Sequence, residues 1–146
     1  MTIDWMAKAV ETLQPKAFTT KETMKFDSLS NRVIGCAIEV HRNLGPGLLE
    51  SSYEQCLAYE LECSAIPYAV QVPMPLQYKQ VQLDCGYRLD LLVDNALIIE
   101  LKSVDKLMGI HQAQLLTYMK LAQVETGLLI NFNVQILKDG IKRFVL

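Results

Sequence analysis

The sequence predicts an α/β (α+β) domain in which helices pack on a central mixed β-sheet. The order of hydrophobic patterns supports this class: two helical stretches precede several extended segments, and one more helix precedes two final strands. The composition agrees, because 51% of the 146 residues are hydrophobic and 21% are charged, which is typical of a globular protein with its own core. No apolar run approaches the roughly 20 residues needed to span a bilayer, so no membrane partner is expected.

Residues 1–26 differ from the rest of the chain. They carry a weak helical periodicity that ends at Pro15 and is followed by a stretch rich in Thr and Lys. We interpret them as a peripheral helix and linker in front of a domain at 27–146. Asp4 and Glu11 interrupt the apolar residues, which does not resemble a signal peptide, and a cytoplasmic location is expected.

Charge and cysteine content narrow the classes of function. A net charge of −2 does not suggest a protein that coats nucleic acid through bulk charge, so contact with nucleic acid needs a local site. The four cysteines form no CxxC pair, and reduced, buried thiols are expected rather than a zinc site or a disulfide. These cysteines are Cys36, Cys56, Cys63 and Cys85.

The first two helices follow from apolar spacing and from the residues that end each helix. Ser30 is a suitable N-cap for the first helix, and His41 is expected near its C-terminal end, facing solvent. The Gly-Pro-Gly sequence at 45–47 ends this helix. The second helix is expected at 48–64, and Pro67 closes it.

The remaining elements are mostly strands. Pro73 and Pro75 restrict their segment to an edge or irregular strand, because proline cannot donate to a sheet ladder. The predicted order of the whole chain is α-α-β-β-β-α-β-β. The predicted later elements are strands within 76–102, a helix at 110–123, a strand at 127–132 and a strand at 141–146.

The hairpin at 87–102 contains charges at alternate positions. Side chains alternate along strands, so the pairing that places Asp90 opposite Glu100 separates the apolar residues from the charged ones. This pairing requires a three-residue loop at 94–96, in which Asn95 tolerates a positive φ. The apolar face then holds Leu89, Leu91, Val93, Leu97, Ile99 and Leu101, and the other face gathers Arg88, Asp90, Glu100 and Lys102.

Two interpretations of the charged end remain open at this point. Adjacent carboxylates repel unless a cation lies between them or one is protonated, and hard oxygen ligands suit Mg²⁺ or Mn²⁺. Alternatively, Arg88 pairs with Glu100 and Asp90 pairs with Lys102 in a cross-strand cluster of ion pairs. Arg88 could also contact phosphate.

Three motifs resemble those of the PD-(D/E)xK nuclease superfamily. Asp90 followed by Glu100-Leu101-Lys102 resembles its D-(x)n-E-x-K signature, although Leu89 stands where the family often has proline. Gln114 and Tyr118 resemble the QxxxY helix of bacterial recombination nucleases. Gly47, Glu50 and Tyr53 resemble the motif that names the GxxExxY family within this superfamily.

The resemblance implies a restriction-endonuclease-like core and a role for each site residue. Asp90, Glu100, Glu50 and the backbone carbonyl of Leu101 would bind Mg²⁺ or Mn²⁺. Lys102 would orient or deprotonate the attacking water, while Gln114 and Tyr118 would brace the site. The implied partner is nucleic acid, expected to be DNA, in repair or defence.

The alternative is a nuclease-fold protein that binds or scaffolds without turnover. A homodimer would enlarge the binding surface and allow both strands to be cut, but no residue pattern identifies an interface.

Overall fold

The computed structural model describes residues 27–146, so the helix and linker predicted within 1–26 lie outside the described residues. No helix in 27–146 combines the length and the apolar content that crossing a membrane requires. In chain order the elements are α3 (Ser28–Leu44), α4 (Glu50–Cys63), β1 (Tyr68–Pro73), β2 (Leu76–Tyr78), β3 (Val81–Leu83), β4 (Arg88–Val93), β5 (Leu97–Lys102), α5 (Gly109–Ala122), β6 (Thr126–Asn131), the 3-10 turn η1 (Leu137–Gly140) and β7 (Ile141–Val145).

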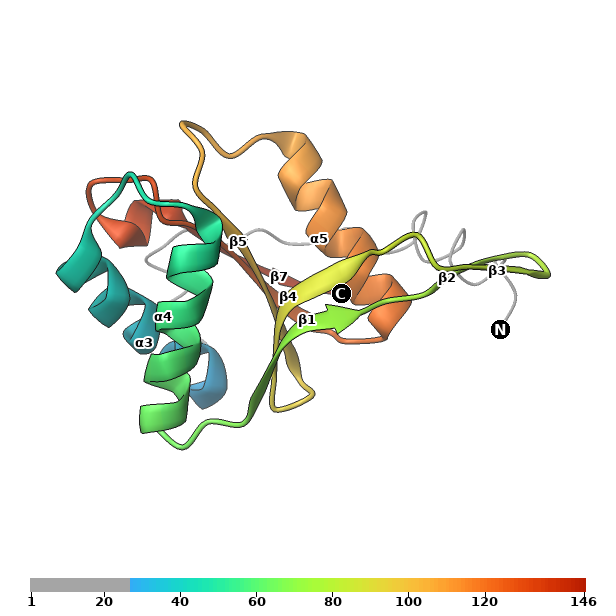
Figure 1. Ribbon diagram of the computed structural model, residues 1–146, viewed down its shortest axis with the longest axis horizontal. Coiled ribbons are helices and arrows are strands. Elements are labelled where there is room, and N and C mark those ends of the chain that lie inside the picture. The colour runs from blue at the N-terminus through green and yellow to red at the C-terminus, as the bar shows by residue number, and fades with distance from the viewer. Residues whose placement is uncertain (1–26) are drawn as a thin grey trace.

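A mixed sheet of five strands forms the middle layer, in the order β1-β4-β5-β6-β7. Only β5 and β6 are parallel, and α5 makes the crossover between them. Helices α3 and α4 cover one face of the sheet, while α5 covers the other (Figure 1). The predicted α+β class with a mixed sheet is therefore confirmed.

Two apolar clusters fill the spaces between these layers. Alternation along β5 sends Leu97, Ile99 and Leu101 toward α3 and α4, and sends Ile98 toward α5. Glu100 and Lys102 lie two and four residues after Ile98, so their side chains point to the same face as Ile98. The strand that carries the two charged residues therefore presents them on the α5 side.

The predicted pairing of the hairpin is confirmed, with one correction. Leu91 pairs with Ile99 and Val93 pairs with Leu97, and a three-residue turn joins the strands. Asn95 has a φ of 52°, as expected. Leu89, however, packs in the α5 cluster and does not share the face of Leu91, because β4 is distorted between them, at Asp90.

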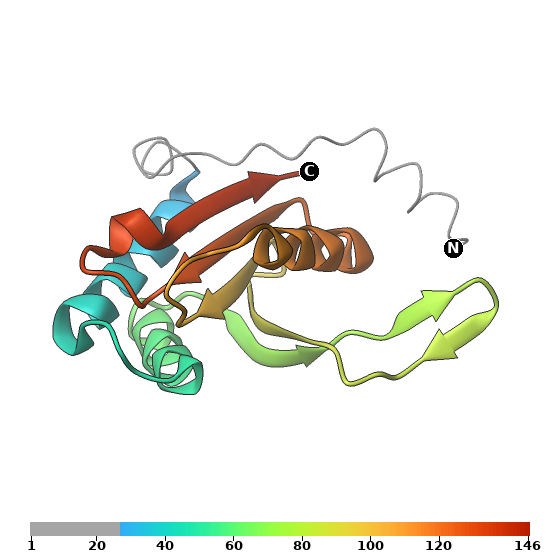
Figure 2. The ribbon, with the colours of Figure 1, turned by 90° about the horizontal axis from the view of Figure 1, so that it is seen from above.

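The sequence prediction undercounted the strands before α5. It expected three, whereas five are present in the described chain, since β2 and β3 form a separate two-stranded sheet. This hairpin projects from the body of the molecule beyond β1 and β4 (Figure 2).

The N-cap of α3 is Asp27, so the assignment of Ser30 as the cap was wrong. The Asp27 carboxylate accepts from the Ser30 backbone N–H at 2.8 Å and also from Arg143 at 2.6 Å. His41 was also misplaced by the sequence, because it is buried and hydrogen-bonds through Nε2 to the Val134 carbonyl. The Arg143–Asp27 and His41–Val134 bonds join α3 to the C-terminal part of the chain, and local spacing in the sequence cannot reveal such contacts.

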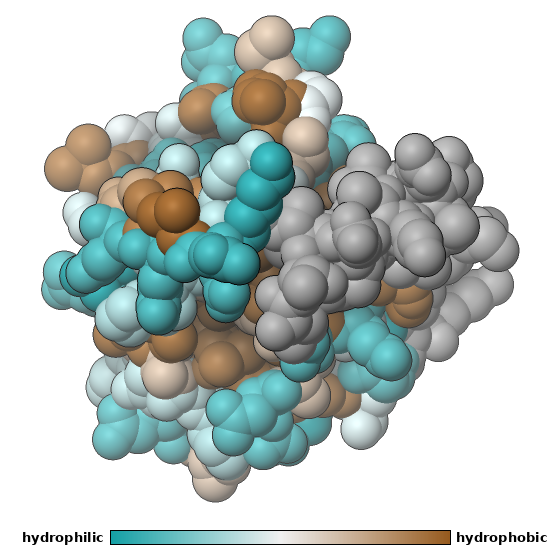
Figure 3. Space-filling view, turned by 90° about the vertical axis from the view of Figure 1, so that its right-hand side faces the viewer, coloured by the Kyte–Doolittle hydropathy of each residue, from teal (hydrophilic) through white to brown (hydrophobic). Residues whose placement is uncertain are grey.

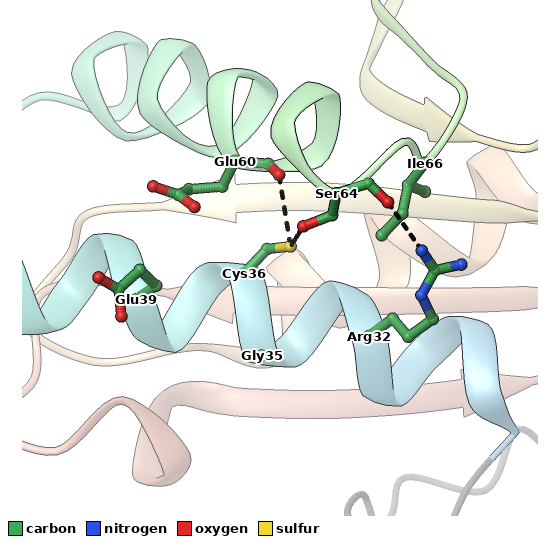
Figure 4. A pocket seen from close by; sticks show the side chains of 7 residues that line it. All are labelled: Arg32, Gly35, Cys36, Glu39, Glu60, Ser64 and Ile66. Carbon is green, nitrogen blue, oxygen red and sulfur yellow. Dashed lines mark hydrogen bonds between the residues drawn. The ribbon is translucent and has the colours of Figure 1, made fainter.

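Polar contacts help to hold α3 against α4. Arg32 donates to the Ser64 carbonyl at the end of α4, and the Cys36 thiol lies 3.6 Å from the Ser64 hydroxyl (Figure 4). The cysteines are all free, as predicted, but Cys63 and Cys85 are exposed and not buried.

Tyr53 anchors the loop that leads into α4. Its ring is fully buried and stacks on Phe132 at a centroid distance of 4.3 Å. Its hydroxyl donates to the Gly45 carbonyl at 2.6 Å and accepts from the Leu48 N–H at 3.2 Å. The tyrosine of the GxxExxY motif thus has a structural role in this chain.

We predict that Tyr53→Phe lowers the free energy of unfolding by about 1–2 kcal/mol, because it removes the buried hydroxyl that bonds to the Gly45 carbonyl and the Leu48 N–H. Urea unfolding of both variants measures this difference. Tyr59→Phe is the matched control, since Tyr59 is 66% exposed, and it should change stability by less than about 0.5 kcal/mol. Equal losses in the two variants would contradict the anchoring role.

Candidate functional site

The strands β4 and β5 separate at Asp90 and Glu100, beyond the last paired residues, Leu91 and Ile99. Side-chain carboxylates bridge the gap here. The Asp90 N–H donates to Glu100 Oε1 at 3.2 Å, and the Leu101 N–H donates to Asp90 Oδ2 at 2.9 Å. The two acidic side chains are therefore fixed beside one another, as the predicted pairing requires.

Glu100 is 4% exposed, which is unusual for a carboxylate. Burial and the neighbouring charge of Asp90 raise the pKa of Glu100 from 4.5 to about 8, although Lys102 opposes the shift. Below about pH 8 Glu100 therefore holds a proton, and a cation bound between the two side chains would displace it.

The alternative of a cross-strand ion-pair cluster is wrong. Within residues 27–146 the ion pairs are Arg42–Glu39 and Arg143–Asp27, and neither involves the hairpin. Arg88 is exposed at the start of β4. An internal ion-pair network therefore does not account for the acidic pair.

A polar chain runs from β5 to α5. Lys102 Nζ donates to Gln114 Oε1 at 3.4 Å, and Gln114 Nε2 donates to the Tyr118 hydroxyl at 3.0 Å. The i, i+4 spacing on α5 brings Gln114 and Tyr118 together, as predicted. Burial raises the pKa of Tyr118, with Glu100 among the charges that add to the shift, so the phenol is expected to stay protonated beside the acidic pair.

Two further residues belong to this region and were missed by the sequence analysis. Gln71 on β1 donates to Glu54 on α4 at 2.7 Å and to Asp90 at 3.5 Å. Burial raises the pKa of Glu54, and the charge of Asp90 adds to this shift. Glu54 follows Glu50 by one helical turn, a spacing that could have indicated it, whereas nothing in the sequence marked Gln71.

Gln71 also marks a distortion of the sheet. Its φ is 50°, an uncommon value for a residue other than glycine, and it has no ladder pairing with Asp90 although Val70 and Val72 are paired on either side. Asp90 thus loses regular pairing with both neighbouring strands. Backbone strain of this kind concentrates at functional sites, where neighbouring structure compensates for it.

Glu50 lies apart from the acidic pair. It is exposed at the first residue of α4, and its carboxylate accepts from the Ser103 N–H at 3.4 Å. Ser103 also donates to the Leu48 carbonyl at 2.6 Å. The structure therefore places Glu50 beside the residue that follows Lys102, and no hydrogen bond within residues 27–146 links it to Asp90 or Glu100.

The donor set fits a hard divalent cation bound in part through water. In the described chain, no three His, Cys, Asp or Glu side chains converge to hold a metal ion. Asp90 and Glu100 nevertheless supply adjacent carboxylate oxygens, with Leu101 between Glu100 and Lys102 on β5. Mg²⁺ commonly binds through one or two carboxylates and retains several waters, so two carboxylates suffice.

We predict that Glu100→Gln stabilises the cation-free protein at alkaline pH. Because the pKa of Glu100 is higher in the folded protein than in the unfolded chain, the protonated carboxyl favours folding. This contribution to stability is fully present below about pH 4.5 and is lost as the pH rises through about 8. The melting temperature of wild type should therefore fall relative to that of Glu100→Gln between these values. Melting curves in a chelator, with the exposed Glu125→Gln as control, measure the difference. Parallel pH profiles for wild type and Glu100→Gln would contradict the raised pKa.

Comparison with known protein families gives a match over most of the chain. The family model of the PD-(D/E)XK nuclease superfamily matches residues 27–144. No curated protein and no solved structure matches the chain. The match covers the sheet, the helices on both of its faces, and each of the motif residues described above. On this evidence the chain belongs to the PD-(D/E)XK nuclease superfamily.

Proposed function

We propose that this protein is a metal-dependent nuclease that hydrolyses phosphodiester bonds of DNA. The observation that carries the proposal is the buried Glu100 carboxyl fixed beside the half-buried Asp90, whose charge helps to raise the pKa of Glu100, with Lys102 two residues farther along the same face of β5. Superfamily membership supports nuclease chemistry and the use of a divalent metal.

Asp90, Glu100 and the backbone carbonyl of Leu101 are the proposed ligands of Mg²⁺ or Mn²⁺. Bound there, the ion would supply charge neutralisation at phosphate oxygens and lower the pKa of a water molecule. Two backbone N–H groups already hold one oxygen each of Asp90 and Glu100, so the carboxylates are oriented before the ion binds. Glu50, which accepts from the Ser103 N–H next to Lys102, would hold a water bound to the ion.

Lys102 is the proposed catalytic cation. Among the described residues its ammonium makes one long hydrogen bond, 3.4 Å to Gln114, which leaves donors for a phosphate oxygen or an attacking water. Gln114 is held in turn by Tyr118, so these two residues would position Lys102. A mobile positive charge at this place would offset the charge that develops on the phosphate.

Gln71 and Glu54 are proposed as supports of Asp90. The Gln71 amide bridges the carboxylates of Glu54 and Asp90. It would hold one oxygen of Asp90 in place while the other Asp90 oxygen accepts from the Leu101 N–H. Glu54 adds negative charge on the α4 side of the site. Together they would strengthen the attraction of the site for a cation.

Several finer assignments remain predictions. These are membership of the GxxExxY family, a role in repair or defence, a cytoplasmic location, and the division into a linker at 1–26 and a nuclease-like domain at 27–146.

We predict that Asp90→Asn weakens Mn²⁺ binding by at least about 10-fold, because it removes one of the two charged ligands. Isothermal titration calorimetry with Mn²⁺ measures the affinity. Asp94→Asn makes the same chemical change in the exposed turn of the same hairpin and should leave binding unchanged. If wild type binds no Mn²⁺, the metal site is wrong, and a nuclease-fold scaffold without turnover becomes the better reading.

We predict that Lys102→Ala reduces cleavage on the order of 10²-fold or more while metal affinity stays equal or rises slightly, since a nearby positive charge is removed. Cleavage of plasmid and labelled oligonucleotides with Mg²⁺ or Mn²⁺, beside calorimetry, separates the two effects. Lys106→Ala is the control, because Lys106 is exposed four residues away. Unchanged cleavage by Lys102→Ala would overturn its catalytic role.

A further inference from the structure

The projecting hairpin, which we call the arm, comprises strands β2 and β3 and the turn between them. Leu76 pairs with Leu83, Gln77 with Gln82, and Tyr78 with Val81. Within residues 27–146 these strands pair only with each other, and they extend away from the five-stranded sheet (Figures 1 and 2). A lone two-stranded hairpin is marginally stable in water, so the arm is expected to gain stability from a partner.

The two faces of the arm differ in polarity. Because cross-strand partners share a face, one face carries four apolar side chains and the other carries Gln77 and Gln82. Tyr78 is 53% exposed and Val81 is 52% exposed. The apolar face consists of Leu76, Tyr78, Val81 and Leu83.

An apolar groove begins where the arm meets the body. It has a volume of about 270 Å³ and runs along α5. Leu76 lies both on the apolar face of the arm and in the wall of this groove, so the two surfaces are continuous. Figure 3 views the end of the molecule from which the arm projects, where apolar side chains lie among polar ones. The groove is lined mainly by Leu76, Tyr87, Ile110, Thr117, Tyr118 and Leu121.

We propose that the apolar face of the arm of one copy packs into the groove of a second copy, and reciprocally, to form a symmetric dimer. One chain carries both complementary surfaces, which is what a two-fold interface requires. The arm points away from the body, and of its apolar face only Leu76, at its base, lines the groove of its own chain (Figure 2). Burying Tyr78 and Val81 between copies would remove the most exposed apolar side chains of the arm from water.

The charges of the arm favour a protein partner over nucleic acid. Between Leu76 and Asp84 the charged residues are Lys79, at the turn, and Asp84, so the segment has no net charge. Lys79 Nζ lies 5.3 Å from the centre of the Tyr78 ring. Binding to nucleic acid relies on several cations that neutralise phosphates, and the arm does not provide them.

The first experiment measures the mass of the full chain by sedimentation equilibrium over a range of concentrations. Wild type should dimerise, and Val81→Glu should raise the dimer dissociation constant at least ~10-fold, because it would bury an unpaired charge. Gln82→Glu introduces the same charge on the polar face of the arm and should leave the dimer intact. Circular dichroism shows whether each variant remains folded.

A second experiment tests whether the arm meets the groove rather than the other arm. Ile110, at the groove, is 70% exposed, and Ile110→Lys should also give a monomer. Mixing Val81→Glu with Ile110→Lys should restore a dimer, because one arm–groove contact gains an ion pair and the other is wild type. A mixture that stays monomeric would overturn the proposed geometry.

Other occupants of this surface give different results. A wild type that is monomeric at every concentration overturns the proposal. Binding of a labelled oligonucleotide then identifies the occupant: if Val81→Glu weakens that binding, the arm contacts nucleic acid and not a second copy. Neither readout depends on cleavage, so the dimer can fail while the proposed nuclease activity stands, and the reverse also holds.

Discussion

The hydrogen bonds that Asp90 and Glu100 make across the β4–β5 gap are the interaction on which the site depends. Regular pairing would turn both backbones toward each other and leave the carboxylates without fixed donors. Here the Asp90 and Leu101 N–H groups each hold a carboxylate oxygen, so backbone pairing is exchanged for a defined side-chain geometry. The exchange is costly, because Glu100 is buried beside another acid and its pKa rises to about 8.

The rest of the fold compensates for this cost. Leu91, Val93, Leu97 and Ile99 are fully or almost fully buried under α3 and α4, and hold the strands together just beyond the gap. On the other face, the parallel crossover from β5 to β6 places α5 over the site, so that Gln114 reaches Lys102. The distortion at Gln71 admits a contact from α4, which regular β1–β4 pairing would not allow. The helices on the two faces thus reach the acidic pair indirectly, α4 through Gln71 and α5 through Lys102.

The site and the arm are adjacent but have different physical characters. Gln114 and Tyr118 belong to the polar chain from Lys102, and they also line the apolar groove along α5. The arm is apolar on one face and uncharged overall, whereas the site is acidic and partly buried. A second copy held in the groove would therefore lie next to the residues that position Lys102, and assembly and catalysis would share one surface of α5.

The sequence by itself determined the α+β class, the hairpin pairing and the Gln114–Tyr118 contact, because alternation in strands and the i, i+4 spacing in helices are local rules. It also placed Asp90 beside Glu100. Tertiary structure alone decided the rest. Asp27 caps α3 with help from Arg143, more than a hundred residues away. Glu54 and Gln71 face Asp90 because α4 packs on a distorted β1, and a positive φ at glutamine cannot be read from the sequence. Leu89 faces α5 for the same reason: strand alternation predicts a face only while the strand remains regular.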